Sequence, residues 1–238
     1  MRPNCPFFPA VGTALKIGKF SIPSPIAGVD VENLARQTTV RIQTAKSSGS
    51  GTIVRRQGQT YTVLTNWHVV AIVRGDRTIV TGNGLLHRRL GVPRRLGDTD
   101  LAIVEFRRAI EYKVAPISAE PAAVGEPLRS ARVPCRCTGV GCSAGVRRTA
   151  AAQIFASRLC FGYTNEVKIG MSGGPIFNAK GFLVGINGRG KYQDPDFEVY
   201  AFEDATEPTT ELLEKMIKSS WEIPISIYWQ FVSSHLGS

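Results

Sequence analysis

A series of short strand-like segments separated by turns is the feature of this 238-residue sequence that most restricts its fold. Residues 39–44 alternate apolar and polar side chains with a period of two, which is typical of a half-buried strand. Further segments rich in β-branched or apolar residues lie at 52–56, 60–65, 77–81 and 101–106. Turn-forming residues at 47–51 and 57–59 separate three of them. Such closely spaced strands predict a small closed or partly closed barrel.

The second half of the chain repeats this pattern less clearly. Strand-like residues resume near Val114 and are evident at 159–163, 174–177 and 181–186. Residues 210–217 have apolar side chains at helical spacing and an acid in the first turn, which predicts a short helix near the C-terminus. The predicted fold class is therefore all-β, with one short C-terminal helix.

Residues 128–152 do not follow the pattern on either side of them. They are rich in arginine, alanine and cysteine and lack the alternation of a strand. Two explanations stay open: an unusual loop, or a segment in which the reading frame has shifted.

The net charge of +10 raises the question of an anionic partner. The arginines occur as short pairs and are not interleaved with aromatic residues, at 55–56, 88–89, 94–95 and 147–148. This distribution favours a solvated basic surface over a specific nucleic-acid site. An anion-binding protein is nevertheless kept as a separate functional hypothesis. No apolar run approaches the roughly 20 residues of a transmembrane helix, so no membrane-spanning segment is expected.

The five cysteines are an odd number, so at least one has no partner within the chain. Cys135 and Cys137 lack the two-residue spacer of common zinc sites, and Cys142 and Cys160 do not restore it. We therefore expect neither a metal site nor a disulfide framework.

Residues 1–35 are predicted to be a leader or a flexible N-terminal arm. Residues 5–12 and 24–28 faintly resemble a signal peptide with a cleavage site, which is compatible with a periplasmic or secreted protein. Pro6 and Pro9 interrupt the apolar stretch, however, and Lys16 and Lys19 end it early. The pattern leaves the compartment undecided.

His68 is the first residue with a chemically informative setting, because it comes directly after an apolar strand. A neutral imidazole can take a proton from a hydroxyl near pH 7 and return it, as general acid–base catalysis requires. A lone histidine is more often structural, and His87 and His235 receive that interpretation.

Asp100 directly precedes the apolar strand 101–106. A carboxylate there can accept the imidazole Nδ1–H and stabilise the imidazolium. Asp98 is the competing candidate, and alone either aspartate would be read as a turn residue.

Ser172 lies in the sequence Gly-Met-Ser-Gly-Gly-Pro at 170–175. A nucleophilic serine needs a nearby base and backbone N–H groups aimed at the developing oxyanion. Glycine at 170 permits a conformation that directs the N–H groups of Gly170 and Ser172 to one point. A glycine-rich turn with an incidental serine would explain this motif alone, but not the order His68, Asp100, Ser172.

With these three motifs, residues 38–190 resemble the chymotrypsin-like (trypsin-like) serine peptidases, which have the same order of triad residues. The chain looks most similar to bacterial and cyanobacterial members and to the catalytic domain of high-temperature-requirement proteases. The resemblance implies two six-stranded antiparallel β-barrels with the triad between them. The expected domains are a first barrel at 36–115 and a second barrel with the C-terminal helix at 116–238.

The resemblance also implies a substrate site. Gly188, Arg189 and Gly190 would pair with the backbone of an extended peptide or protein substrate. Glu166, six residues before the serine, would line the specificity pocket and favour Arg or Lys, although Lys168 could neutralise it. No metal or organic cofactor is expected, and the oligomeric state is not indicated.

Three positions depart from the digestive members of this family. Val69 replaces a cysteine, Met171 replaces the aspartate that pairs with a newly cleaved N-terminus, and Gly188 replaces a serine that supports the triad aspartate. The sequence thus predicts a serine endopeptidase that forms an acyl-enzyme and is not activated through that ion pair. The alternative is a catalytically impaired peptide-binding or regulatory module with the same fold.

Overall fold

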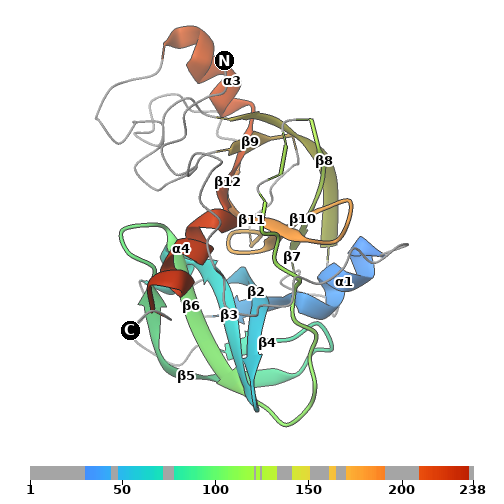
Figure 1. Ribbon diagram of the computed structural model, residues 1–238, viewed down its shortest axis with the longest axis vertical. Coiled ribbons are helices and arrows are strands. Elements are labelled where there is room, and N and C mark those ends of the chain that lie inside the picture. The colour runs from blue at the N-terminus through green and yellow to red at the C-terminus, as the bar shows by residue number, and fades with distance from the viewer. Residues whose placement is uncertain are drawn as a thin grey trace.

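The computed structural model describes residues 30–43, 48–71, 78–120, 122–123, 125–132, 141–150, 161–164, 170–190 and 209–235. Within these ranges the protein is predominantly β, with two sets of strands that lie one above the other in Figure 1. Glu166 and the cysteines Cys5, Cys135, Cys137 and Cys160 lie outside the described residues.

The first six strands form a closed antiparallel barrel in the order β1-β2-β3-β6-β5-β4, and β4 pairs back with β1. Val40, Ile53, Tyr61, Val63 and Phe106 point into this barrel and are buried. The strands are β1 (Thr39–Gln43), β2 (Ser48–Gln57), β3 (Thr60–Asn66), β4 (Thr78–Val80), β5 (Leu86–Arg95) and β6 (Leu101–Arg107).

Five of these six strands overlap the segments predicted from the sequence, and β5 was not predicted. β2 begins at Ser48, so residues 48–51, which were predicted to be a turn, are part of the strand. The sequence of β5 contains four arginines together with Gly91 and Pro93, which are uncommon in strand interiors. Its register with β6 shifts between Leu90 and Arg94, so a bulge accommodates both residues. The barrel supplies β5 with partners on both sides, and this tertiary pairing overrides a poor local propensity.

The second set of strands follows the order β10-β11-β12-β9-β8-β7, and β10 also pairs with β7. Its described ladders are shorter, because β9 has only three residues and β10 four. This coarser architecture agrees with the all-β prediction. The strands are β7 (Pro127–Arg132), β8 (Gly141–Ala150), β9 (Phe161–Tyr163), β10 (Pro175–Asn178), β11 (Leu183–Arg189) and β12 (Ser220–Pro224).

The loop interpretation of residues 128–152 is wrong for a large part of that segment. β7 and β8 pair along six residues, from Pro127 opposite Val146 to Arg132 opposite Gly141. In β7, Leu128 and Ser130 are buried and Arg129 is exposed, so the alternation exists, but a serine occupies a core position. Ser130 is compatible with burial because its hydroxyl donates a hydrogen bond to Asn187.

Four helices accompany the described strands: α1 (Val31–Thr38), the short α2 (Trp67–Val70), α3 (Thr210–Ile217) and α4 (Ile225–His235). The prediction of a helix at 210–217 is confirmed by α3. Residues 31–35, which the sequence analysis assigned to an N-terminal arm, instead form most of α1. The side chain of Asp30 caps this helix, and Ala35 is buried. Among the described residues, no helix combines the length and apolarity needed to cross a membrane.

One hydrophobic core joins the two sets of strands. It combines Leu64, Leu101 and Ile103 of the first barrel with strand residues of the second set, including Phe177, Leu183 and Ile223. The C-terminal helix α4 contributes Ile225, Ile227 and Tyr228 to the same cluster and lies beside the junction in Figure 1. Because the two halves share this buried surface, their relative position is held by apolar contacts.

Candidate active site

The pairing of β3 with β6 brings His68 and Asp100 together. Asn66, the last residue of β3, lies opposite Leu101, the first residue of β6. His68 follows in α2 and Asp100 precedes β6, so both leave the sheet at the same edge. The backbone N–H of Trp67 and the side-chain amide of Asn66 both donate to the carbonyl of Asp100, at 2.9 and 3.1 Å.

The carboxylate of Asp100 contacts His68 through both of its oxygens. Oδ1 accepts the backbone N–H of His68 at 2.9 Å, and Oδ2 lies 2.7 Å from Nδ1. The aspartate side chain is 15% exposed and the histidine side chain 48% exposed. With Nδ1–H donating to the carboxylate, Nε2 is the nitrogen that can accept a proton on the open side of the ring.

Asp98, the competing candidate, has a different role in the structure. Its backbone carbonyl accepts a hydrogen bond of 2.8 Å from the guanidinium of Arg95. Arg95 also donates to the carbonyl of Thr99 at 2.8 Å and lies over the ring of Trp67. This arginine therefore braces the residues directly before both Asp100 and His68. Arg95 could not be predicted as a supporting residue, because an arginine pair on a strand gives no local sign of such contacts.

Ser172 lies in a tight loop before β10. Gly170 and Gly173 have φ angles of +89° and +82°, which residues other than glycine rarely adopt. The loop is closed by a hydrogen bond of 2.9 Å from Gly174 N–H to the carbonyl of Met171. These positive φ angles explain why glycine occupies both positions of the motif.

Ser50 of β2 attaches this loop to the first barrel. Its N–H donates to the carbonyl of Ser172 at 2.8 Å, and its hydroxyl donates to the carbonyl of Gly170 at 2.6 Å. A Cβ built on the neighbouring Gly49 would lie 2.6 Å from Val69 and 3.2 Å from the carbonyl of Ser172. The backbone of Ser172 therefore lies close to the residue that follows His68.

Asn187 holds the same loop from the second set of strands. This fully buried side chain donates to the carbonyl of Gly174 at 3.2 Å and accepts hydrogen bonds from Ser130 and Tyr163. Its backbone carbonyl accepts the N–H of Gly173 at 2.9 Å. Burial raises the pKa of Tyr163 well above its ordinary value, and the nearby carboxylate of Glu222 adds to this, so the phenol stays protonated and can donate. The sequence signal for Asn187 was its position as a polar residue directly after the apolar run 183–186.

Gly173→Ala is expected to destabilise the protein and displace the serine loop. The added methyl group would meet the carbonyl oxygen of Ser50 at 2.2 Å and Thr65 Oγ1 at 2.3 Å, in addition to the unfavourable φ. We expect the free energy of unfolding, measured by urea titration, to fall by at least about 2 kcal/mol.

Gly58→Ala is the matched control, since Gly58 also has a positive φ, of 60°, but nothing lies within 4 Å of its Cβ position. It should cost only about 1 kcal/mol. Equal losses of stability in the two variants would show that the close approach of Ser50 and Thr65 does not restrict which side chain residue 173 can carry.

The residues predicted to bind substrate are only partly described. Gly188 is buried, and it falls where the register of β11 with β12 shifts between Asn187 and Arg189. Gly190 follows the end of β11 and is half-buried, whereas the side chain of Arg189 and all of Glu166 lie outside the described part of the chain.

His87 is in the structural setting that was predicted for it. Its ring is buried, stacks on Phe106, and has Nε2 3.0 Å from the hydroxyl of Tyr112. Burial lowers the pKa of His87, with a smaller contribution from the charge of Arg108, so its neutral form is favoured. His235 has no described side chain.

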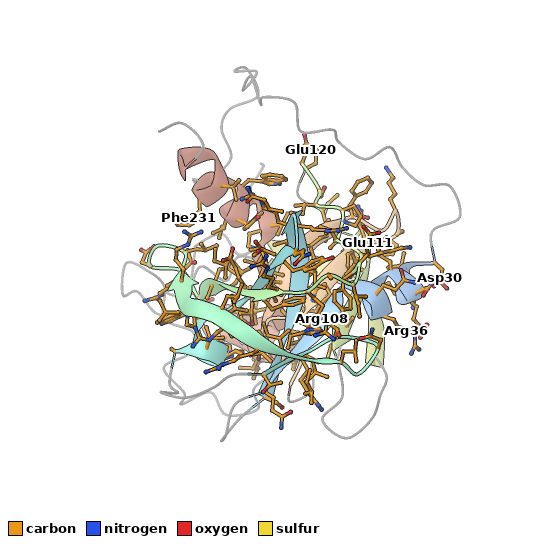
Figure 2. All side chains as sticks on the ribbon, turned by 90° about the horizontal axis from the view of Figure 1, so that it is seen from below. Asp30, Arg36, Arg108, Glu111, Glu120 and Phe231 are labelled. Atoms are coloured by element: carbon orange, nitrogen blue, oxygen red, sulfur yellow. The ribbon has the colours of Figure 1, made fainter. Side chains whose placement is uncertain are left out.

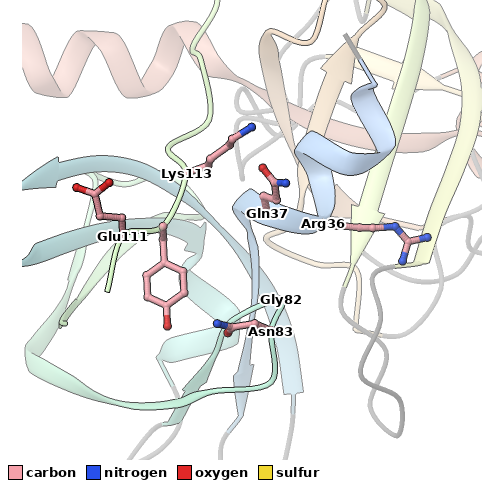
Figure 3. Close-up of a pocket in the computed structure, with 7 residues that line it drawn as sticks. Arg36, Gln37, Gly82, Asn83, Glu111 and Lys113 are labelled. Atoms are coloured by element: carbon pink, nitrogen blue, oxygen red, sulfur yellow. The ribbon is translucent and has the colours of Figure 1, made fainter. Parts of the chain in front are cut away.

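An open cavity of about 380 Å³ lies elsewhere, between α1 and the loop after β4 (Figure 3). Gln37, Asn83 and Lys113 are among the residues that line it. Its other charged groups are already bonded, Arg36 to Glu32 and Glu111 to Arg56, both at 2.6 Å. None of His68, Asp100 and Ser172 lines this cavity, so it is separate from the candidate active site.

Comparisons with known proteins agree with this fold. The family model for the trypsin-like peptidase domain matches residues 49–186. A crystal structure of the Rv3671c protease in an inactive form has a TM-score of 0.62 at 17% identity, covering 86% of this chain and 91% of that one. The serine endoprotease from Yersinia pestis gives 0.60 at 20% identity, covering 87% of this chain and 66% of that one. At these identities the two structures establish the fold alone. No curated protein sequence matches the chain significantly.

Proposed function

Because this chain belongs to the family of trypsin-like peptidase domains, we propose that it is a serine endopeptidase with His68, Asp100 and Ser172 as its catalytic triad. The observation that carries the proposal is the contact of both Asp100 oxygens with His68, at 2.9 and 2.7 Å. Hydrogen bonds from Ser50 attach the Ser172 loop to the barrel that carries this pair, which supports the proposal.

The proposed reaction begins when Ser172 Oγ attacks the carbonyl carbon of a peptide bond and its proton passes to His68 Nε2. Asp100 remains ionised and stabilises the imidazolium. The carbon–nitrogen bond then breaks, His68 protonates the leaving amine, and an acyl-enzyme on Ser172 remains. Water attacks this ester, with His68 as the base, and releases the acid product. No metal or organic cofactor takes part in these steps.

The backbone N–H groups of Gly170 and Ser172 are proposed to stabilise the oxyanion. The carbonyl of Met171 shares a peptide unit with the N–H of Ser172 and accepts the N–H of Gly174 at 2.9 Å, so the orientation of this donor is restricted. Ser50 binds the carbonyls of Gly170 and Ser172 at 2.6 and 2.8 Å, which fixes the peptide units on either side of it. These contacts would hold the Ser172 N–H in place before the negative charge develops.

Residues 188–190 are proposed to bind the substrate backbone as an added strand. The shift of register beside Gly188 and the end of β11 at Arg189 leave this segment without a continuous partner in β12. Glu166 is proposed to line the specificity pocket and to favour Arg or Lys at the cleaved position. Paired peptides that differ only as Arg or Phe at that position test this preference, and faster cleavage after Phe would exclude it.

We also propose the full two-barrel arrangement of the family, with residues 36–115 and 116–238 as its halves. The first barrel is closed, and the return pairing of β10 with β7 supports a second. The triad would then lie between the halves, with His68 and Asp100 from one and Ser172 from the other.

Labelling by a fluorophosphonate probe tests the proposed function directly, because the probe reacts with activated serines. We expect the folded parent chain to be labelled and Ser172→Ala to remain unlabelled. Labelling of neither, in protein whose fold is shown by circular dichroism, would favour a non-catalytic peptide-binding module with the same fold.

A further inference from the structure

The outer face of β5 carries an unusual concentration of exposed apolar side chains. Among the described residues, four large hydrophobic side chains are strongly exposed, and three of them lie on this strand. Leu86 is 66% exposed, Leu90 40% and Val92 84%. Exposed apolar groups that gather on one element are more informative than scattered ones, because they mark surfaces that are covered in use.

The conformation of β5 projects part of this surface away from the barrel. Leu90 lies opposite Glu105 and Arg94 opposite Ile103, so β5 has three residues where β6 has one. Gly91 in this bulge has a φ of +55°. Such bulges redirect side chains, and here the redirected side chain is that of Val92.

Arginines surround the apolar residues. Arg88 and Arg94 are exposed on β5, and Arg107 is exposed on β6, next to the residue that pairs with Arg89. Glu105, opposite Leu90, is the one acid among the outward positions of this part of β6, and it lies 3.4 Å from the hydroxyl of Thr62. We name the surface formed by Leu86, Arg88, Leu90, Val92, Arg94 and Arg107 the β5 patch.

The barrel restricts how a partner can contact the β5 patch. Among the described residues, β5 pairs with β4 at 86–88 and with β6 at 89–90 and 94–95, so much of its edge is already occupied. We therefore expect contact through the side chains of its outer face. Figure 2 shows β5 crossing the near face of the molecule in the view from below, away from the second set of strands.

We propose that the β5 patch binds the surface of an anionic lipid bilayer. The arginines would bind lipid phosphates, and Leu86, Leu90 and Val92 would enter the boundary between headgroups and acyl chains. A nucleic acid would use the charge but would gain little from leucine and valine, and the one aromatic ring of β5, that of His87, is buried where bases could not stack on it. The net charge of +10 favours the same class of partner.

Co-sedimentation of the full chain with vesicles tests the proposal. The vesicles contain phosphatidylcholine alone, or phosphatidylcholine and phosphatidylglycerol at about 3:1. We expect binding to the anionic vesicles only, weakened by added salt. Arg88→Gln with Arg94→Gln should weaken this binding about 30-fold, and Leu90→Ser with Val92→Ser about tenfold.

Lys113→Gln with Lys180→Gln is the matched control, because it removes the same charge from two exposed residues outside the β5 patch. It should change binding by less than about threefold. An equal loss in this control would mean that overall basicity, and not the patch, binds the membrane. Unchanged binding of the Leu90–Val92 variant would indicate a site for polyanions, and absence of binding to anionic vesicles would overturn the proposal.

Val92→Trp provides a second measurement that does not depend on loss of binding. Residue 92 is too exposed for this change to disturb the core. Brominated anionic lipids should quench the added tryptophan strongly and the parent fluorescence weakly. Equal quenching of the two would contradict insertion of this bulge.

Discussion

Ser172→Ala is expected to lower kcat for peptide hydrolysis by about 10⁶-fold. The change removes the only atom proposed to form the acyl-enzyme, while the hydrogen bonds that Ser50 makes to the loop go to backbone carbonyls and would remain. Binding and the oxyanion donors should leave a residual rate about 10³–10⁴-fold above that of water alone. Single-turnover hydrolysis of a fluorogenic peptide measures the difference.

Ser118→Ala is a suitable control for the removal of a serine hydroxyl. Ser118 Oγ donates to the carbonyl of Glu120 on a surface connection, distant in sequence from all three motifs. Its activity should remain within about twofold of the parent. If Ser172→Ala retained more than about a hundredth of the parent rate, in protein free of other peptidases, Ser172 could not be the nucleophile.

Asp100→Asn is expected to lower kcat by about 10⁴-fold with little change in KM. An asparagine can keep the same shape and can still accept the N–H of His68. It cannot stabilise the imidazolium, and its amide can turn the imidazole to the tautomer with the proton on Nε2. The loss should therefore fall on the chemical step, which steady-state kinetics at several substrate concentrations will separate from binding.

Asp98→Asn tests the choice of Asp100 over Asp98, its competing candidate. Asp98 contributes its backbone carbonyl to Arg95, and this bond does not depend on the side chain. We expect a change in kcat of less than about threefold. A large loss in Asp98→Asn together with a small loss in Asp100→Asn would reverse the assignment.

Much of the first barrel could be predicted from the sequence, because its strands have a strong local signal. Residues 39–43 and 60–66 alternate or concentrate β-branched side chains, and the structure gives them the same strands within one or two residues. The helix at 210–217 was likewise evident from its spacing of apolar residues. In these segments local propensity and the tertiary fold agree.

The segments that could not be predicted depend on contacts outside the segment itself. β5 is a strand because β4 and β6 enclose it, despite its arginines and Gly91. β7 has a serine in the core, which is compatible with burial because its hydroxyl donates a hydrogen bond to Asn187. α4 is apolar at most positions and shows no clear amphipathic pattern, since several of its side chains enter the core that joins the two halves.

The same division holds for the candidate site. The residue types and their order along the chain made a histidine, an aspartate and a serine candidates for one reaction. The histidine and the aspartate each stand beside a strand, and the serine stands in a glycine-rich turn, as the proposed acyl-transfer chemistry requires. The sequence also favoured Asp100 over Asp98, because Asp100 directly precedes the strand, and the register that places Asn66 opposite Leu101 brings Asp100 to His68. Only the tertiary structure supplied the contacts of Ser50, Arg95 and Asn187, which span from 3 to 120 residues of sequence. The hydrogen bonds of Ser50 and Asn187 join segments that are distant in sequence, and neither segment carries a local pattern that identifies its partner. These contacts therefore become visible only when the chain is folded.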